Sequence, residues 1–290
     1  SLNALLTVAE ELSARAGFST LSAEPLRAAR VIVLHVGASA RGGSPNPCLP
    51  QALTALPAAG SVPGETDAVS AAEWALRTAS RLFADMPAGL VVSSTDSLLL
   101  LPSTAVVPLA ALEEVAGVVV AVPQPLEVAA EHGVCAPAAT GSDLLGSIIY
   151  RGSREQLAPL ASGDGGCAVY TGLLWLSRDT TERLLELHMR PPLDACTYVG
   201  IDSGAPPLAL DLHSDLLAPL CAATSKDAYL AAKPGAARAL LWAALRGAAE
   251  PRPLEASLRL CVTPPESQYL YLRSPDDLRR LLLSPPPALC

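Results

Sequence analysis

The run Val31-Ile32-Val33-Leu34-His35-Val36-Gly37 decides how this chain folds. Apart from His35, its side chains are apolar and mostly β-branched, and they do not alternate with polar residues as in a strand that has one face in water. Such a run predicts a strand buried on both faces, as in a parallel sheet, and Gly37 ends it. A sheet of this kind needs helices on both of its faces.

Segments on either side of this run supply the other elements. Five further runs predict strands: Leu90–Val92, Gly117–Val122, Ala168–Leu176, Ser257–Val262 and Tyr269–Leu272, with Leu208–Leu212 as a sixth. Apolar residues at three- and four-residue steps predict helices over 2–16 and 69–83, and Asp179 and Glu182 open another that runs to Leu187. Because strands alternate with helices, we expect a doubly wound, mostly parallel α/β sheet.

Two further segments complete this prediction. Ser274-Pro275-Asp276-Asp277 indicates the start of a helix, with a Ser cap, Pro at the first position and two acids facing the positive end of the dipole. Residues 38–66, rich in Gly, Pro, Ser and Ala, predict a long loop.

Composition excludes several classes of function. The net charge of −8 and the pI of about 5.0 argue against nucleic-acid binding. Mean hydropathy is high at +0.35, but the most apolar window, Leu98–Val122, is interrupted by prolines and glutamates, so no membrane span is expected. The seven cysteines form no CxxC pair, which argues against zinc and favours reduced thiols in a cytoplasmic protein. The opening residues contain no basic segment or cleavage motif, so no signal peptide is expected.

Polar residues at predicted strand ends are the candidates for chemistry, because ligands of open α/β sheets bind at the carboxyl ends of strands. Gly37 permits close approach of a phosphate, and Arg41 adds positive charge; the alternative is an ordinary turn glycine. In Ser94-Thr95-Asp96, the carboxylate suits Mg²⁺ held against nucleotide phosphates, whereas the alternative is a turn or cap aspartate.

Further candidates lie later in the chain. Acids between Asp194 and Asp215, Asp202 among them, are a possible second carboxylate for a metal site, although solvated loop acids are an equal alternative and spacing does not show that they meet Asp96. His132-Gly133 follows a strand and loop, where an imidazole suits sugar or phosphate, or is a lone satisfied histidine. The chain has no Walker A loop, Rossmann GxGxxG or Ser-His-Asp order.

Several segments, in order, resemble the pyrophosphorylase-like half of the L-fucokinase and fucose-1-phosphate guanylyltransferase family. The resemblance spans nearly the whole chain and thins after about Ala222. The matching segments are Ser1–Leu6, Leu12–Phe18, Val33–Gly37, Ser93–Asp96, His132–Val134 and Pro191–Tyr198, continued by Ile201–Ala205.

This resemblance implies a sugar-nucleotidyltransferase (Rossmann-like) fold over residues 1–282, truncated at both ends, with 283–290 starting a linker toward a C-terminal region. It implies Mg²⁺, GTP or ATP, and fucose-1-phosphate or L-fucose as ligands, and a C-terminal kinase domain in the parent protein. The family's first strand and Gly-rich phosphate loop are absent here. Pro50-Gln51 also stands where the family tends to have a Gly-Lys or Gly-Arg pair.

The resemblance also suggests roles for the candidates. Asp96, Asp202 and Asp215 are the predicted catalytic acids, with Asp96 and Asp215 as metal ligands. The predicted substrate-binding residues are Gly37, Arg41, Ser94, Thr95, His132 and Gly133. Two functions stay open: an enzyme domain that makes GDP-fucose in a salvage route from fucose through fucose-1-phosphate, and an inactive scaffold or regulatory domain attached to a fucokinase.

Overall fold

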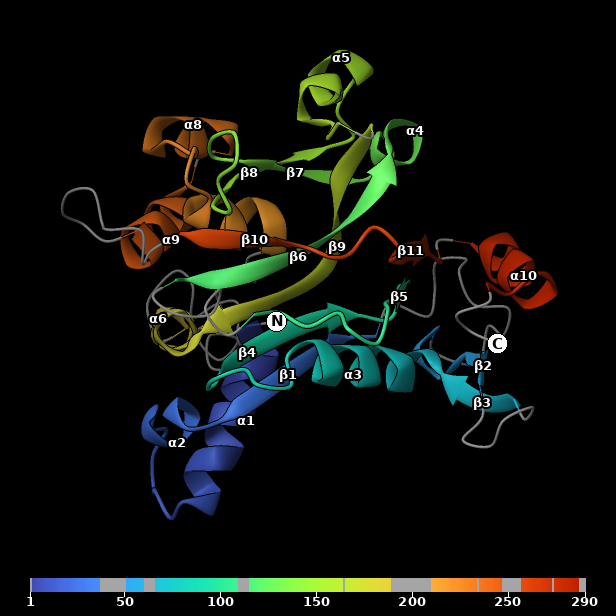
Figure 1. Cartoon of the computed structure of the whole chain (residues 1–290). Coiled ribbons are helices and arrows are strands. Elements are labelled where there is room, and N and C mark those ends of the chain that lie inside the picture. Colours follow the sequence, from blue (N-terminus) through green and yellow to red (C-terminus); the bar gives the residue numbers. More distant parts are fainter. Residues whose placement is uncertain are drawn as a thin grey trace.

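A seven-stranded sheet forms the centre of the computed structural model, which describes residues 2–36, 51–59, 66–108, 115–163, 165–188, 210–233, 235–246, 257–272 and 274–286. Its main row has the order β1 (Arg30–His35), β4 (Gly89–Ser94), β9 (Gly166–Ser177), β6 (Gly117–Pro125) and β10 (Leu258–Val262). The strands β7 (Gly133–Pro137) and β8 (Leu145–Tyr150) continue from one end of β9, at the top of the view in Figure 1.

The sheet is mixed but mostly parallel in direction. β1 pairs with β4, and β6 with β10, in parallel. β9 runs antiparallel to both β4 and β6, so β1, β4, β6 and β10 all point the same way. The predicted α/β class is confirmed, and the carboxyl ends of β1 and β4 lie side by side, with His35 opposite Ser94.

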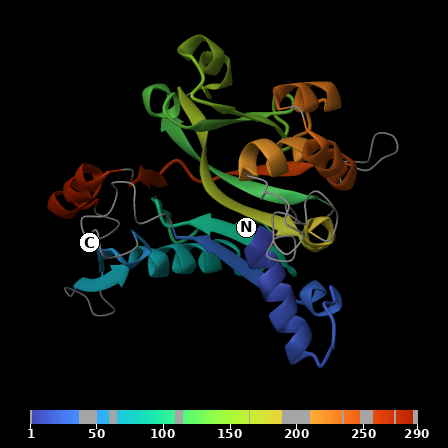
Figure 2. The ribbon, with the colours of Figure 1, turned by 180° about the vertical axis from the view of Figure 1, so that it is seen from behind.

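Helices cover both faces, and the side chains of the central strands alternate between two cores. Leu90 and Val92 of β4 join one core, with α1 (Leu2–Arg15), α6 (Arg178–Leu187) and α9 (Ala236–Arg246), whereas Val91 faces the other, with α3 (Ala71–Leu82). Figure 1 shows α3 in front of β1 and β4, and Figure 2, from behind, shows α1 in front of them. Burial on both faces explains the continuous apolar runs.

Short elements complete the described chain. The helical ones are α2 (Glu24–Arg27), η1 (Gln51–Leu53), α4 (Leu126–Ala129), α5 (Arg154–Leu157), η3 (Ala158–Leu160), η5 (Leu212–Leu217), η6 (Ala218–Leu220), α8 (Lys226–Ala232) and α10 (Pro275–Leu283). Two small antiparallel sheets pair β2 (Ala55–Ala59) with β3 (Thr66–Ser70) and β5 (Ser97–Leu100) with β11 (Gln268–Tyr271). The Ser274 cap on α10 is confirmed, because its hydroxyl accepts from the Asp277 backbone N–H.

Two sequence expectations differ from the structure. The predicted loop over 38–66 contains η1 and β2, and it ends at the first residue of β3. The predicted strand Leu208–Leu212 is wrong within the described residues: Leu210 and Asp211 have no regular structure, and Leu212 opens η5. The reason is that the Asp211 carboxylate accepts hydrogen bonds from the backbone N–H groups of His213 and Ser214, which starts a helical turn. No helix in the described ranges is both long and apolar enough to cross a membrane.

Candidate functional site

A cleft opens where the central sheet divides. β4 pairs with β9 only from Gly89 to Val92, whereas β6, on the other edge of β9, pairs also with the part of β9 before Leu174. The carboxyl end of β4 therefore separates from β9, leaving a space of about 440 Å³ that we call the main cleft. Its lining residues are His35, Val92, Ser93, Ser94, Asp96, Glu131, His132, Gly133, Tyr150, Arg151, Tyr170, Thr171, Gly172, Asp211, Leu212, His213, Tyr269 and Tyr271.

An irregularity in β9 shapes one wall of the main cleft. The register between β6 and β9 shifts between Val119 and Ala121, and Gly172 has a φ of 80°, a conformation that favours glycine. The Val120 carbonyl there accepts a hydrogen bond from the Thr171 hydroxyl at 2.8 Å. The bulge thus turns Thr171 and Gly172 toward the cleft without leaving the Val120 carbonyl unpaired.

Asp96 lies in the turn between β4 and β5, half-buried at the main cleft. The Ser94 hydroxyl donates to its Oδ1 at 2.5 Å, and its backbone carbonyl accepts from the Leu272 N–H at 2.7 Å. These contacts fix the turn and bring β11 alongside, so that Asp96 faces Tyr269. Burial raises the pKa of Tyr269 far above its usual value, and the nearby Asp96 charge raises it further. The Tyr269 hydroxyl therefore stays protonated.

Thr95, the residue between Ser94 and Asp96, does not line the main cleft, contrary to its predicted substrate-binding role. Its side chain is fully buried, and its backbone N–H donates to the His35 carbonyl at 3.0 Å. Strand alternation points Ser94 and Thr95 in opposite directions, so only one of the two reaches the cleft. Thr95 instead joins the end of β4 to the end of β1.

His132 and Gly133 line the main cleft between α4 and β7. The His132 ring lies edge-on to Tyr269 and Tyr271, with centroids 5.3 and 5.6 Å away. A Cβ on Gly133 would lie 2.7 Å from the ring of Tyr150, so the absent side chain makes room for that ring. The structure therefore brings this predicted pair together with Asp96 through β11, although the pair follows Asp96 by more than thirty residues in the chain.

A second aromatic cluster surrounds His213 in the cleft. Its ring lies 5.1 Å from that of Tyr170 and 5.4 Å from that of Tyr150, between centroids. Burial lowers the pKa of His213, although the nearby Asp211 carboxylate opposes part of this shift. Burial also lowers the pKa of His35, so both imidazoles are neutral at pH 7 and able to donate and accept hydrogen bonds.

Arg151 is a residue that the sequence did not single out. It lines the main cleft and follows β8, with a φ of 48°, the one positive φ at a non-glycine residue among those described. Its backbone N–H donates to the His132 carbonyl at 3.0 Å, whereas its exposed side chain makes no ion pair with a described residue. Strained conformations of this kind concentrate at functional sites, and a guanidinium at the wall of a cleft suits a phosphate.

Asp215 does not join Asp96 in the main cleft. Its side chain is fully buried, with Oδ1 bound to Nη1 of Arg238 at 2.7 Å and Oδ2 accepting from the Asp211 N–H at 2.9 Å. Lys233 adds a longer contact to Oδ2 at 3.4 Å. A carboxylate bound on both oxygens and closed to solvent is a structural ion-pair member, so its predicted place beside Asp96 as a metal ligand is wrong.

The remaining predicted residues, Gly37, Arg41 and Asp202, lie outside the described residues, as does most of the segment from Asp194 to Asp215. Of the predicted set, Ser94, Asp96, His132 and Gly133 meet in one cleft. Apart from His132, sequence reasoning missed the aromatic side chains there. Four of the chain's six tyrosines line this cleft, together with His35 and His213, but they come from distant segments, and no local pattern marks them.

The fold and the cleft define an α/β protein with a polar, aromatic-lined binding site at the carboxyl ends of its parallel strands. The model of the fucose pyrophosphorylase domain matches residues 23–285, and the chain belongs to that family. Membership supports a nucleotidyltransferase-like role and a transferase activity.

A solved structure, the nucleoside-diphosphate-sugar pyrophosphorylase from Vibrio cholerae, is similar at 13% sequence identity and a TM-score of 0.32. The match covers 68% of this chain and 56% of that protein, so it spans little more than half of the bacterial protein's length. No curated protein matches the sequence.

Proposed function

We propose that the main cleft binds a nucleoside triphosphate and fucose-1-phosphate and transfers the nucleotidyl group between them, forming GDP-fucose when the nucleotide is GTP. The observation that carries this proposal is the position of Asp96, at the carboxyl end of β4 in a cleft lined by tyrosines and histidines. Tyrosine rings offer flat surfaces to a base or sugar, and the carboxylate supplies a ligand for a hard cation.

In this reaction a phosphate oxygen of fucose-1-phosphate attacks the α-phosphorus of GTP. A new O–P bond forms, the bond between the α-phosphorus and the bridging oxygen breaks, and pyrophosphate leaves with the electron pair. Charge builds on the phosphates, so we assign Arg151 to neutralise part of it and the neutral His35 and His213 to hydrogen-bond the ligands. The cleft also holds the two ligands in position for the attack, which contributes further to the rate enhancement.

Mg²⁺ is part of the proposal, with Asp96 as its protein ligand and the Ser94 hydroxyl holding that carboxylate in place. The donor set fits, because Mg²⁺ in nucleotide sites commonly uses one or two carboxylates and takes its other oxygens from phosphates and water. No cluster of three or more His, Cys, Asp or Glu ligands occurs among the described residues, so a site made by protein side chains alone is not expected from them. When bound, the ion would neutralise phosphate charge.

The parent protein, in this proposal, acts in GDP-L-fucose salvage and carries a C-terminal kinase domain that makes fucose-1-phosphate from L-fucose. We place the reaction in the cytoplasm. The support is that Cys135, Cys167, Cys221 and Cys261 are free thiols, as is usual in a reducing compartment.

The test is to incubate the purified chain with GTP, fucose-1-phosphate and Mg²⁺ and to quantify GDP-fucose and pyrophosphate by chromatography. Asp96→Asn is expected to reduce the rate at least 100-fold, because it removes the proposed metal ligand, on the order of 3 kcal/mol of transition-state stabilisation. Asp85→Asn is the matched control, because Asp85 is exposed and outside the cleft. Unchanged turnover by Asp96→Asn overturns the assignment, and a parallel reaction with ATP tests the nucleotide preference.

A second candidate function, binding without turnover, is favoured by one observation. Arg151 is the one Lys or Arg among the cleft-lining residues that the structure describes, whereas a triphosphate and a sugar phosphate together carry several negative charges. This function predicts that calorimetry detects binding of GDP-fucose while the chain forms no GDP-fucose above background. Product formation by the wild-type chain that Asp96→Asn abolishes rules it out.

A further inference from the structure

A second cavity adjoins the main cleft, between α4, β11 and α10, and α10 lies beside the end of β11 at the right of Figure 1. It has a volume of about 410 Å³, and we call it the outer cavity. His132, Tyr269 and Tyr271 line both spaces, so the two meet at these three rings. Apolar residues from α4, from β11 and from α10 form much of the remaining wall, and Asp277 and Arg280 are its charged residues.

The elements that carry the outer cavity are fixed by core packing. Leu278 and Leu281 of α10 are buried in one cluster with Leu272 and with Leu98 of β5. β11 pairs with β5 along its length, and the Leu272 N–H extends that ladder to the Asp96 carbonyl. A ligand in the outer cavity therefore meets side chains held on a packed helix and strand, as a specific site requires.

Tyrosine rings form one wall of the outer cavity. Tyr269 and Tyr271 stand on the same side of β11, because side chains two residues apart in a strand point the same way. Their rings are nearly parallel, with an interplanar angle of 16° and centroids 6.5 Å apart, and His132 meets both edge-on. Tyr271 is 37% exposed, and the exposed Val128 also lines the cavity. Aromatic and apolar surface of this kind suits the stacking of a flat heterocyclic ring.

Arg280 is the one Lys or Arg, among the residues that the structure describes, that lines the outer cavity. Its side chain is exposed and makes no ion pair with a described residue, unlike its neighbour Arg279, which pairs with Asp276. Asp277, three residues earlier on the same helix face, balances this charge, and its Oδ2 accepts from the Ser274 N–H and hydroxyl at 2.9 and 2.8 Å. The walls therefore offer hydrogen bonds to a neutral ring and little net charge to a free phosphate.

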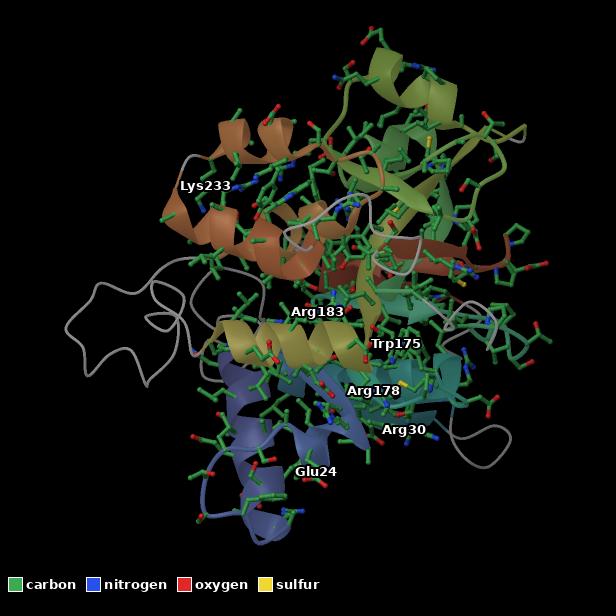
Figure 3. The ribbon with its side chains drawn as sticks, turned by 90° about the vertical axis from the view of Figure 1, so that its left-hand side faces the viewer. Glu24, Arg30, Trp175, Arg178, Arg183 and Lys233 are labelled. Atoms are coloured by element: carbon green, nitrogen blue, oxygen red, sulfur yellow. The ribbon has the colours of Figure 1, made fainter. Side chains whose placement is uncertain are left out.

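Other arginines are remote from both cavities. Figure 3, a view onto the side of the molecule away from α10, shows Arg30 and Arg178, which lie at the amino end of β1 and at the start of α6. A ligand that spans both cavities therefore meets, among the described residues that line them, the guanidinium groups of Arg151 and Arg280.

We propose that the outer cavity binds the base of the nucleotide whose phosphates lie in the main cleft, and that Arg280 selects guanine over adenine. Guanine presents two acceptors, O6 and N7, on one edge, and a guanidinium donates to both at once. Adenine carries an amino donor in place of O6, and a guanidinium, which has donors only, cannot pair with that amino group. The volume of the outer cavity is within the range of small-molecule sites.

This arrangement divides one ligand between the two cavities. Tyr269 lines both and faces Asp96, so a ribose beside Tyr269 connects a base at Arg280 with phosphates in the main cleft. Arg280 contacts the ligand away from the reacting phosphorus, so it determines which base binds rather than the rate of transfer. The position of the phosphates rests on the proposed function of the main cleft, whereas base selection is measurable without turnover.

The binding test titrates the full chain with GDP, IDP and ADP in the presence of Mg²⁺, by calorimetry. IDP keeps O6 and N7 but lacks the 2-amino group of guanine, so we expect it to bind like GDP, and ADP to bind at least tenfold more weakly. Arg280→Ala is expected to weaken the binding of GDP and IDP at least tenfold and that of ADP less than twofold, which removes the preference. Arg279→Ala is the matched control, because Arg279 is exposed on the same helix and does not line the outer cavity.

A second variant tests the outer cavity itself. Val128→Trp fills it and is expected to weaken the binding of all three nucleotides at least tenfold, whereas Glu127→Trp, at an exposed neighbour that does not line the cavity, should leave binding unchanged. Four results overturn the proposal: no binding of any of the three nucleotides, equal binding of GDP and ADP by the wild type, a GDP preference that survives in Arg280→Ala, or equal binding by Val128→Trp and the wild type.

Failure of the main cleft gives a different result. If the wild type binds GDP through Arg280 but makes no GDP-fucose, the base site is supported and nucleotidyl transfer is refuted. If the wild type makes GDP-fucose and Arg280→Ala keeps its preference for GTP over ATP, the base lies elsewhere and transfer in the main cleft is supported.

Discussion

Arg151 shows, at the scale of one residue, how a strained backbone serves a binding site. Its positive φ is costly for a side chain with a Cβ, by roughly 1–2 kcal/mol, and glycine would relieve that strain. Its guanidinium is also the described positive charge that lines the main cleft. Stability therefore favours glycine at position 151, whereas phosphate binding favours arginine.

We expect Arg151→Ala and Arg151→Gly to weaken fucose-1-phosphate binding about tenfold or more, because both remove a charged hydrogen-bond donor. The Gly variant should be more stable than the Ala variant by about 1 kcal/mol, since only Ala retains the strain. Calorimetry and urea unfolding measure the two effects. Arg154→Ala is the control, because Arg154 is exposed and does not line the main cleft. Tight binding by either Arg151 variant contradicts the assigned role.

The histidines of the main cleft predict a pH dependence of stability. Burial lowers the pKa of His35 and His213 below the ordinary 6.5, and His188 shifts in the same direction. The unfolded chain therefore binds more protons than the folded chain between the lowered and the ordinary pKa. Stability is complete above pH 6.5 and falls as the pH decreases through 6.5 toward the folded values.

Urea unfolding between pH 7.5 and 5.5 measures this dependence. We expect the free energy of unfolding to fall across about this range, and to fall less steeply in His213→Phe, which keeps a ring against Tyr150 and Tyr170 but does not titrate. An identical slope in the variant would show that His213 is not the group responsible.

At the scale of one element, the bulge in β9 creates the main cleft. A regular β9 would pair continuously along β6, but the bulge directs Thr171 and Gly172 into the gap beside β4. The Thr171 hydroxyl replaces the missing ladder partner of the Val120 carbonyl. The Thr171 side chain therefore completes the hydrogen bonding of the backbone at the point where the sheet divides.

Thr171→Val keeps the shape of the side chain but removes this hydrogen bond. We expect it to lower the free energy of unfolding by about 1–3 kcal/mol, because the buried Val120 carbonyl then lacks its partner. Thr171→Ser retains the hydroxyl and should be closer to the wild type. Chemical denaturation measures the free energy of unfolding of the wild type and the two variants. Equal decreases in Thr171→Val and Thr171→Ser would show that loss of the hydrogen bond is not the cause of the destabilisation.

At the scale of the whole molecule, the Asp215–Arg238 pair connects η5 to α9. His213 of η5 and the residue that caps this helix, Asp211, line the main cleft, and α9 packs into the core on the face that α1 and α6 cover. The pair therefore fixes one wall of the cleft to the body of the protein. A buried ion pair need not add net stability, but removal of one partner leaves an uncompensated charge.

Asp215→Ala is expected to lower the free energy of unfolding by about 3–5 kcal/mol, because Arg238 remains buried without its carboxylate. The double variant Asp215→Leu/Arg238→Met should regain most of this loss. Thermal and chemical unfolding measure both, with the exposed Asp85→Ala within about 0.5 kcal/mol of the wild type as control. A stable Asp215→Ala protein that lost only metal-dependent activity would restore the metal-ligand hypothesis.

Local patterns were sufficient to predict the strands β1, β4, β6, β9, β10 and β11 and the helices α1, α3, α6 and α10, whereas β7, β8, α8 and α9 were not predicted. The continuous apolar runs at β1 and β6 depend only on which neighbours are apolar, and the cap at Ser274 depends on a side chain three residues from the N–H group that it binds. The strand predicted over Leu208–Leu212 failed because the Asp211 carboxylate captured the next backbone N–H groups, a choice that composition does not reveal.

Which residues meet was decided by the tertiary structure. Asp96 and Tyr269 are far apart in the chain and come together because β5 pairs with β11, whereas Asp215, chemically the same as Asp96, is buried against Arg238. By itself, the sequence determined the α/β class, the strand ends and the family resemblance, because these reside in local order. Strand order and packing alone decided which carboxylate faces the main cleft and which is neutralised, because burial and pairing are properties of position in space.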